Sequence, residues 1–285
     1  MNRSSRRPRR ALHAPKPPGS VAGRDALRFP GRAPREAPSF LELPERSRKP
    51  RDRGITCVLD RGLSLASVDG LIEVAGDAVD LVKLGWGTAV VMENLDAKLA
   101  RYRQHGIPVV LGGTLTELAV AQGRVDGLVD WLGEIGLRHV EVSDGAIRLP
   151  HAEKLALIER LAGDFTVLSE VGAKDASRGM APDVWVTQIE RELEAGAWKV
   201  IAEARESGTA GIYHADGSAN VELIDEIAAA VPADRLLFEA PRKEQQAWLV
   251  RRFGANVNLA NIAADDVVAV ETLRLGLRFD TMPRP

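Results

Sequence analysis

The stretch Lys199-Val-Ile-Ala-Glu-Ala-Arg-Glu-Ser-Gly208 decides the fold class of this chain. It begins as an apolar run typical of a buried strand and then turns abruptly to Glu203, Arg205 and Glu206. A parallel strand that is covered on both faces should be apolar throughout. Charges at its carboxyl end therefore indicate a functional site. Side chains two residues apart on a strand point the same way, so Glu203 and Arg205 are expected to share one face.

The same layout recurs along the chain from Gly54 onward. Eight apolar strands alternating with helices predict a (β/α)₈ TIM barrel in a single α/β domain. A doubly wound open sheet is the alternative, but no Gly-x-Gly-x-x-Gly follows the first strand. The expected strands are Ile55–Asp60, Asp80–Gly85, Pro108–Gly113, His139–Ser143, Thr166–Val171, Lys199–Arg205, Leu236–Ala240 and Val257–Asn261. The expected helices are Ser64–Ala75, Asn94–His105, Leu115–Gln122, Val125–Ile135, Ala152–Ala162, Asp183–Ala195, Val221–Ala230, Lys243–Phe253 and Ala264–Leu275.

The charges are distributed unevenly along the 285 residues. The net charge is −2, yet the first 50 residues hold 13 Lys and Arg against 4 Asp and Glu. Residues 1–38 are rich in Arg and Pro and lack apolar periodicity, so we predict a disordered extension there. Residues 39–285 are predicted to form the catalytic barrel domain. Phe40, Leu41 and Leu43 are expected to begin the ordered part and to pack under the first strand.

The composition is typical of a cytoplasmic enzyme. Hydrophobic residues make up 45% of the chain, and no apolar run is long enough for a membrane span. Cys57 is the single cysteine, which excludes an internal disulfide and suits a reducing compartment. The basic extension allows nucleic-acid binding or a transit peptide as alternatives, but a flexible extension is the simpler interpretation, and no nucleic-acid or membrane partner is expected.

Polar and charged residues gather at the predicted carboxyl ends of the strands, where barrel enzymes place their sites. No His or Cys is among them, which argues against zinc. Carboxylates crowded at one mouth repel each other unless cations are present, and an all-oxygen site suits Mg²⁺. The strand-end residues are Asp60, Lys83, Gly112, Gly113, Thr114, Glu141, Ser143, Asp144, Glu170, Glu203, Arg205, Glu239, Asn258 and Asn261.

Each of these residues also has a purely structural interpretation. A single strand-end Glu is commonly a loop charge, and Lys83 could serve only as a structural ion-pair partner. The glycines at 112 and 113 could serve only in a turn, although glycine there also lets a backbone approach an anion. Trp86 could be a packed aromatic instead of a wall of the site. Four Glu residues in register on successive strands favour a shared site.

With these motifs in place, the chain resembles the phosphosulfolactate synthase family. The resemblance runs from about Phe40 to Thr281 and does not include the basic extension. The matching motifs are Asp60-Arg-Gly62, Lys83-Leu-Gly-Trp-Gly-Thr88, Gly112-Gly-Thr-Leu-x-Glu117, Glu141-Val-Ser-Asp-Gly145, Glu170-Val-Gly172, Glu203-Ala-Arg-Glu-Ser-Gly208, Phe238-Glu-Ala-Pro241 with Lys243 and Gln245-Gln246, Val257-Asn-Leu-Ala-Asn-Ile262, and Glu271-Thr-Leu-Arg-x-Gly-Leu-Arg278 with Asp280.

The resemblance implies a carbon–sulfur lyase of coenzyme M biosynthesis that adds sulfite to C3 of phosphoenolpyruvate with Mg²⁺, forming (2R)-phospho-3-sulfolactate. It implies that Lys174, just past the fifth strand, donates the proton to C2. One departure is Arg61, where the family usually has lysine. The metal-ligand candidates are Glu141, Glu170, Glu203 and Glu239, and spacing alone does not rank them.

Two anionic substrates in one mouth require cations besides the metal. Arg205 has the planar fork that suits sulfite or phosphate, and Lys83 is expected to neutralise the other anion. Phosphate in barrels commonly lies beyond strands seven and eight, where Arg242, Lys243 and Asn261 are expected. The remaining residues predicted to contact substrate are Asp60, Gly113, Thr114, Ser143 and Asn258.

Two other functions remain open at this stage. One is the addition of a different nucleophile to a similar acceptor in a specialised pathway. The other is a non-catalytic barrel, because a plant branch of the family is described as heat-stress-associated. Charged residues at almost every strand end favour catalysis, and a homo-oligomer is expected.

Overall fold

The computed structural model describes residues 38–172 and 180–283. The predicted disordered extension over residues 1–38 therefore lies outside the described residues, except for Pro38. Lys174, the predicted proton donor, also lies outside them. The division of the chain into an extension and a barrel domain stays a prediction.

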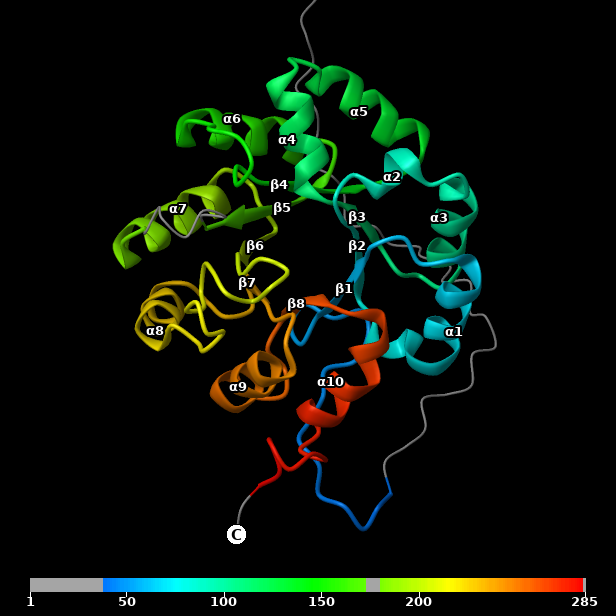
Figure 1. Ribbon diagram of the computed structural model, residues 1–285, viewed down its shortest axis with the longest axis vertical. Helices are drawn as coiled ribbons and strands as arrows, with labels where there is room; N and C mark the ends of the chain where they lie inside the picture. Colours follow the sequence, from blue (N-terminus) through cyan, green and yellow to red (C-terminus); the bar gives the residue numbers. More distant parts are fainter. Residues whose placement is uncertain (1–37, 173–179, 284–285) are drawn as a thin grey trace, which may run out of the picture. The chain divides into compact units, whose positions relative to one another are not determined.

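Eight parallel strands close into a barrel in the order of the chain (Figure 1). The first strand pairs with both the second and the eighth, which closes the ring and excludes an open sheet. The predicted (β/α)₈ barrel is confirmed. The strands are β1 (Thr56–Asp60), β2 (Leu81–Leu84), β3 (Val109–Leu111), β4 (His139–Val142), β5 (Thr166–Val171), β6 (Lys199–Ala202), β7 (Leu236–Glu239) and β8 (Leu259–Ile262).

Helices surround the barrel (Figure 1). They form because apolar residues recur at helical spacing; in the helix Val221–Ala230, for example, Leu223, Ile224 and Ile227 make up the buried stripe. In the described part of the chain, no helix is both long and apolar enough to span a membrane. The helices are α1 (Leu65–Ala75), η1 (Gly76–Ala78), α2 (Thr88–Val91), α3 (Leu95–Gln104), α4 (Gly113–Ala121), α5 (Val125–Glu134), α6 (His151–Ala162), α7 (Pro182–Glu194), α8 (Val221–Ala230), α9 (Lys243–Phe253), η2 (Ala264–Asp266) and α10 (Val267–Arg274).

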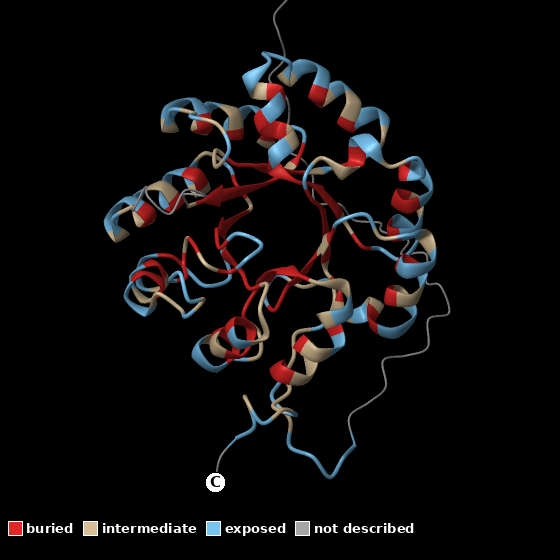
Figure 2. Ribbon diagram, in the orientation of Figure 1, coloured by how far each residue is buried: buried red, intermediate tan, exposed pale blue. Residues whose placement is uncertain are grey.

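The core has two layers because the strands are buried on both faces (Figure 2). Alternate residues such as Val82, Val200 and Phe238 pack outward in the large cluster shared with the helices. The residues between them form a second, small cluster that fills the barrel interior. Its members are Ile55, Cys57, Leu81, Val110, Leu168, Ile201, Leu237 and Ala260.

The amino ends of the strands form the base of the barrel, which is stabilised by buried polar contacts. Arg46 donates from Nε to Glu271 Oε1 at 2.8 Å and from Nη1 to Asn256 Oδ1 at 3.0 Å. These contacts tie the segment before β1 to the elements at the end of the chain. Phe40 and Leu41 do not pack under the first strand as expected, because their exposures are 82% and 41%.

Candidate active site

The two-residue period of a strand places one polar layer directly above the apolar interior. Lys83 lies two residues after the interior residue Leu81, and Glu170 lies two residues after Leu168. In the same way, Glu203 follows Ile201 and Glu239 follows Leu237. Since successive side chains point to opposite faces, all four polar side chains reach the interior at the carboxyl ends of the strands.

These residues form the floor of a cavity of about 450 Å³ at the barrel mouth. Among the described residues that line it, five carboxylates face only two cations, Lys83 and Arg205. The lining residues are Leu59, Lys83, Gly85, Trp86, Gly112, Gly113, Thr114, Glu141, Ala146, Glu170, Glu203, Arg205, Glu206, Ser207, Glu239 and Asn261.

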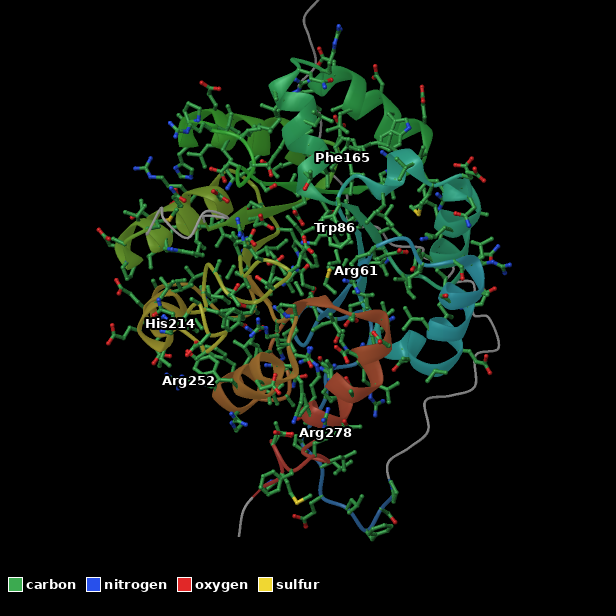
Figure 3. The ribbon with its side chains drawn as sticks, viewed as in Figure 1. Arg61, Trp86, Phe165, His214, Arg252 and Arg278 are labelled. Atoms are coloured by element: carbon green, nitrogen blue, oxygen red, sulfur yellow. The ribbon has the colours of Figure 1, made fainter. Side chains whose placement is uncertain are left out.

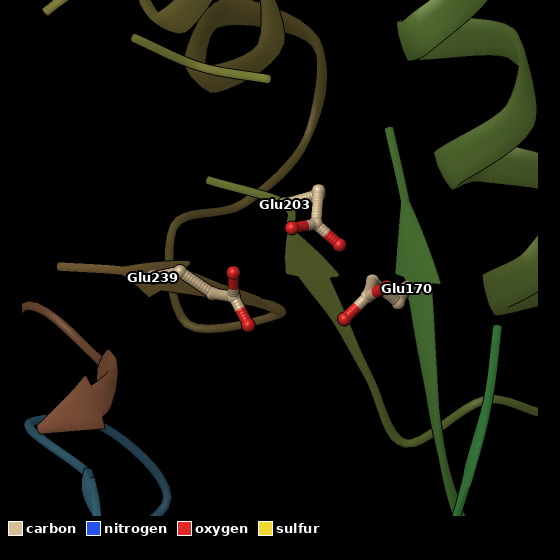
Figure 4. A group of neighbouring side chains, drawn as sticks. All are labelled: Glu170, Glu203 and Glu239. Carbon is tan, nitrogen blue, oxygen red and sulfur yellow. The ribbon is translucent and has the colours of Figure 1, made fainter. Parts of the chain in front are cut away.

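Three of the carboxylates converge on one point. Glu170, Glu203 and Glu239 each contribute an oxygen, and these oxygens lie within 4.8 Å of one another. All three residues are buried, and Figure 4 shows their carboxylates turned toward a common space from three neighbouring strands. Glu141 is not part of this group. Three carboxylate oxygens gathered in this way could hold a divalent cation, because such cations bind oxygen ligands.

Lys83 lies beside the acidic group and is held by two other contacts. Its Nζ is 3.1 Å from Glu141 Oε2 and 3.2 Å from Glu239 Oε1. Burial alone would lower the pKa of Lys83, but the nearby Glu141, Glu239 and Glu170 outweigh it and raise that pKa well above its usual value. Lys83 therefore remains a cation at neutral pH.

At Glu239, unlike at Lys83, burial outweighs the neighbouring opposite charge. Burial raises the pKa of this carboxyl group, the cation of Lys83 works against that effect, and the charge of Glu170 adds to it, so the net shift is upward. The second carboxylate oxygen accepts a hydrogen bond from the backbone N–H of Ala204 at 2.9 Å. Beneath this layer, burial raises the pKa of the Cys57 thiol to about 12, so it stays protonated and unreactive.

Glu141 connects Lys83 to the start of α4. Its Oε1 accepts a hydrogen bond from the backbone N–H of Gly113 at 2.9 Å. A side chain at Gly113 would force its neighbours to move, because a Cβ atom would lie 2.8 Å from Glu141 Oε1 and 2.0 Å from Ser143 Oγ. Glycine is thus required at this position by close approach, and Thr114 follows it at the cavity wall.

The backbone is strained at the mouth. Three described residues other than glycine have left-handed backbone angles, and all three line the cavity: Trp86 at φ 54°, Arg205 at φ 57° and Asn261 at φ 55°. Such conformations cost energy for bulky residues and gather at functional sites. Arg205 also shows that the predicted sixth strand was too long, since β6 ends at Ala202. Glu203 and Arg205 nevertheless both line the cavity, although they do not lie on one strand.

Two guanidinium groups lie at the mouth. Arg205 lines the cavity, and its backbone N–H donates to Glu203 Oε1 at 2.5 Å. Arg61 lies over the ring of Trp86, with its Cζ atom 5.8 Å from the ring centroid. Figure 3 places Arg61 and Trp86 near the centre of the barrel view, well away from Arg252 and Arg278. Arg61, which departs from the family's usual lysine, thereby adds a stacked cation at the rim.

Asp60, a predicted substrate contact, is fully buried and does not line the cavity. Its oxygens accept hydrogen bonds from Lys98 Nζ at 2.9 and 3.0 Å and from Tyr102 at 3.1 Å. Backbone N–H groups of Gly62 and Leu63 donate to it as well. In this structure Asp60 shapes the loop after β1, and its contact with substrate stays a prediction.

Four other predicted substrate contacts are also absent from the cavity lining, because their side chains are engaged elsewhere, and their roles stay predictions. Ser143 donates to Glu117 at 2.6 Å, and Asn258 lies before β8 at the base, where it donates to the carbonyl of Leu236 at 2.8 Å. Arg242 caps α9, and Lys243 pairs with Asp280 at 2.9 Å, so neither lines the cavity. The nine predicted residues that line it are Lys83, Gly113, Thr114, Glu141, Glu170, Glu203, Arg205, Glu239 and Asn261.

Several residues of the site were not assigned a role from sequence. Ser207 and Ala146 line the cavity, and both belong to motifs in which neighbouring residues were chosen for their charge. Glu117 was noted within a glycine motif, but its contacts with residues far along the chain could not be seen there. A buried Glu on an otherwise apolar helix face was the available signal.

The fold and the site together define the class of protein. A closed (β/α)₈ barrel that gathers buried carboxylates, cations and strained residues around a cavity at its carboxyl end is built as a barrel enzyme. A solved structure described as the YdjI aldolase from Escherichia coli K12 shares the fold, with a TM-score of 0.50 at 14% identity. That match covers 76% of this chain and 78% of the aldolase.

Sequence comparison identifies the family. The profile described as (2R)-phospho-3-sulfolactate synthase (ComA) matches residues 44–280. The phosphosulfolactate synthase of Bacillus subtilis (strain 168) is 41% identical over 85% of this chain and 97% of its own. That of Methanothermobacter thermautotrophicus is 39% identical over 84% and 95%. The chain belongs to the phosphosulfolactate synthase family and is an enzyme that acts on small molecules.

Another relative is less similar to this chain. The Arabidopsis thaliana protein HEAT-STRESS-ASSOCIATED 32 is 23% identical over 83% of this chain and 91% of its own.

Proposed function

We propose that this enzyme adds sulfite to C3 of phosphoenolpyruvate in a magnesium-dependent reaction that yields (2R)-phospho-3-sulfolactate. The observation that carries the proposal is the convergence of Glu170, Glu203 and Glu239 on one point in the cavity of a phosphosulfolactate synthase family member. A buried group of three carboxylates is costly unless a cation is held there.

The donor set fits Mg²⁺. All the candidate ligands are carboxylate oxygens, and the described lining residues include no His or Cys that would favour zinc. Lys83 is already engaged by Glu141 and Glu239, so its single charge does not balance the acidic group. When bound, Mg²⁺ would supply positive charge beside the oxygens on which negative charge develops.

The proposed chemistry is a conjugate addition. The lone pair on the sulfur of sulfite forms the bond to C3, the electron pair of the C2–C3 double bond moves toward C2 and the carboxylate, and C2 then takes up a proton. Lys83 stabilises the negative charge as a permanent cation. Arg205 binds one of the two anions with its planar fork. Lys174 remains the proposed proton donor to C2, on the basis of the family resemblance.

The direct test is incubation of the protein with phosphoenolpyruvate, sulfite and Mg²⁺. We expect loss of the enol absorbance and a new phosphate-ester signal in ³¹P NMR, both dependent on sulfite. Chelation should stop turnover, and added Mg²⁺ should restore it. Phosphoenolpyruvate that remains unchanged under these conditions would contradict the sulfite reaction, and turnover that resists chelation would remove the metal from the proposal.

Glu203→Gln tests the acidic group with little change in shape. We expect turnover to fall by about 100-fold or more, because Mg²⁺ would be held more weakly and its stabilisation of the developing oxyanion would be lost. Binding of Mn²⁺, followed by its paramagnetic resonance signal, should weaken in parallel. Glu244→Gln is the control, since it removes the same charge from an exposed position in the first turn of α9. Equal Mn²⁺ affinities in the two variants would argue against Glu203 as a ligand.

A further inference from the structure

Glu117 is a buried carboxylate on α4 that lies outside the cavity. Its Oε1 accepts a hydrogen bond from Ser143 Oγ at 2.6 Å. Its Oε2 accepts hydrogen bonds from the backbone N–H groups of Ala146 at 2.5 Å and Ile147 at 2.9 Å. One side chain therefore holds three donors of the segment that follows β4. The segment 143–147 is called the β4 loop below.

The β4 loop is also held from its other side. Lys154, on α6, donates to Asp144 Oδ1 at 2.9 Å and to the backbone carbonyl of Glu170 at 2.6 Å. Lys154 is fully buried and pairs with Glu192 at 2.8 Å. The loop is thus fixed between two buried charged groups, and its Ala146 forms part of the cavity wall.

Close packing transmits the position of the β4 loop to the floor of the cavity. Ser143 Oγ lies so near Gly113 that a Cβ atom there would be 2.0 Å away, so the serine packs directly against the first residue of α4. The N–H of Gly113 in turn holds Glu141 Oε1 at 2.9 Å. The other oxygen of Glu141 is 3.1 Å from Lys83 Nζ. Each link is a direct contact between groups that are almost fully buried.

We propose that Glu117 is a positioning residue of the reaction. It acts through Ser143 and Gly113 on the Glu141–Lys83 pair, so that the cation of Lys83 stays at the cavity floor. This inference rests on the proposed function, since it concerns the placement of groups for that chemistry. What Glu117 contributes is reach and hydrogen-bond acceptance, and its negative charge is not required at the reacting atoms.

Two conservative variants separate reach from charge. Glu117→Gln keeps the reach: its amide oxygen can accept from the two backbone N–H groups, and its NH₂ can donate to Ser143, whose hydroxyl also accepts. Glu117→Asp keeps the charge but withdraws the carboxylate by about 1.5 Å, one carbon–carbon bond. A positioning role predicts an active Gln variant and an impaired Asp variant, and a role of the charge itself predicts the reverse.

The readout is kcat/KM for phosphoenolpyruvate, together with Mn²⁺ affinity. We expect Glu117→Asp to lower kcat/KM by about 10- to 100-fold, the usual effect of disturbing a residue that orients a site, and Glu117→Gln to stay within a few-fold of the parent protein. Mn²⁺ affinity should change less than kcat/KM in both, because the chain of contacts ends at Lys83 and meets the acidic group only at Glu239. Leu118→Ala, on the exposed side of the same helix, is the matched control.

The outcomes distinguish this inference from the proposed function. A parent protein that forms phosphosulfolactate, with Glu117→Asp as active as the parent or Glu117→Gln as impaired as Glu117→Asp, overturns the inference alone. A parent protein that forms no product overturns the proposed function. In that case the same variants are compared by calorimetric binding of phosphoenolpyruvate, where weaker binding to Glu117→Asp than to Glu117→Gln supports the positioning role and equal binding overturns it.

Discussion

The two ends of the barrel bury charge in opposite ways. At the base, Arg274 is 1% exposed, and its guanidinium donates to the carbonyls of Ala255, Val257 and Ile55. Lys199 likewise donates to the backbone carbonyls of Asp52 and Asp234. Backbone carbonyls of the chain thus accept hydrogen bonds from both buried cations. Their contacts join segments distant in sequence, and their role is to stabilise the closed ring.

At the mouth, acidic groups outnumber cations among the described lining residues, and the three described non-glycine residues with left-handed backbone angles are found there. Such an arrangement is unfavourable for the empty protein and favourable once a cation and anionic substrates are bound. The difference teaches that buried charge alone does not indicate a site. A stronger sign is an excess of one charge among the described residues that line a cavity.

The largest expected effect on stability comes from Lys83, a buried cation at the mouth that is paired like the cations at the base of the barrel. Lys83→Met leaves Glu141 and Glu239 without their shared cation, and breaking a buried ion pair costs about 3 kcal/mol of unfolding free energy. Urea unfolding in a chelator measures this loss, and Mg²⁺ should restore more stability to the variant than to the parent. Arg205→Met is the control: its side chain is exposed, so a change within about 0.5 kcal/mol is expected. Equal losses in the two variants would contradict the role of Lys83.

Arg46→Ala tests the base. The pair with Glu271, at 2.8 and 3.0 Å, contributes about 2 kcal/mol to stability as a charged hydrogen-bonded pair, while kcat should not change. The control is Arg252→Ala, whose exposed pair with Asp225 should contribute less than about 1 kcal/mol. A large loss of kcat in Arg46→Ala at unchanged stability would show that base and mouth are not separate in function.

The pH dependence of the same pair has a definite sign. Burial would raise the pKa of Glu271, but its hydrogen bond and charge interaction with Arg46 outweigh burial and lower that pKa below the ordinary value of 4.5. A carboxyl group with a depressed pKa contributes stability above its unfolded pKa and loses it as the pH falls through the folded one. Arg46→Ala should therefore lose less stability than the parent when the pH is lowered below about 4.5. Parallel curves would contradict this assignment.

The sequence predicts the barrel and its acidic floor well for a simple physical reason. Strand period and burial depend on neighbouring residues, so Glu170, Glu203 and Glu239 could be assigned to the carboxyl ends of strands. The predicted eighth strand, Val257–Asn261, begins two residues earlier than β8, which begins at Leu259. This shift places Asn258 at the base, where four hydrogen bonds hold it.

Partner choice over long sequence separations could not be predicted. Asp60 and Ser143 occupy strand ends as expected, but Lys98 and Glu117, which engage them, lie 38 and 26 residues away. A local pattern shows that a polar group is present and not whether another side chain already satisfies it. Only the packing of helix against strand determines which strand-end residues remain available to a ligand.

The smallest expected effect concerns strain at the mouth. Trp86 has a φ angle of 54°, which costs an L-residue about 1 kcal/mol, and its indole is 46% exposed. Trp86→Gly relieves the strain, whereas Trp86→Ala removes the same ring but keeps the Cβ atom. We expect the free energy of unfolding, measured in urea, to be higher for the Gly variant than for the Ala variant. The difference should be up to about 0.5 kcal/mol after the greater chain entropy of glycine is counted. Both should lose activity equally, because both remove the ring on which Arg61 lies. If the Ala variant is the more stable of the two, the left-handed backbone carries no cost, and the contrast between a strained mouth and a relaxed base reduces to charge alone.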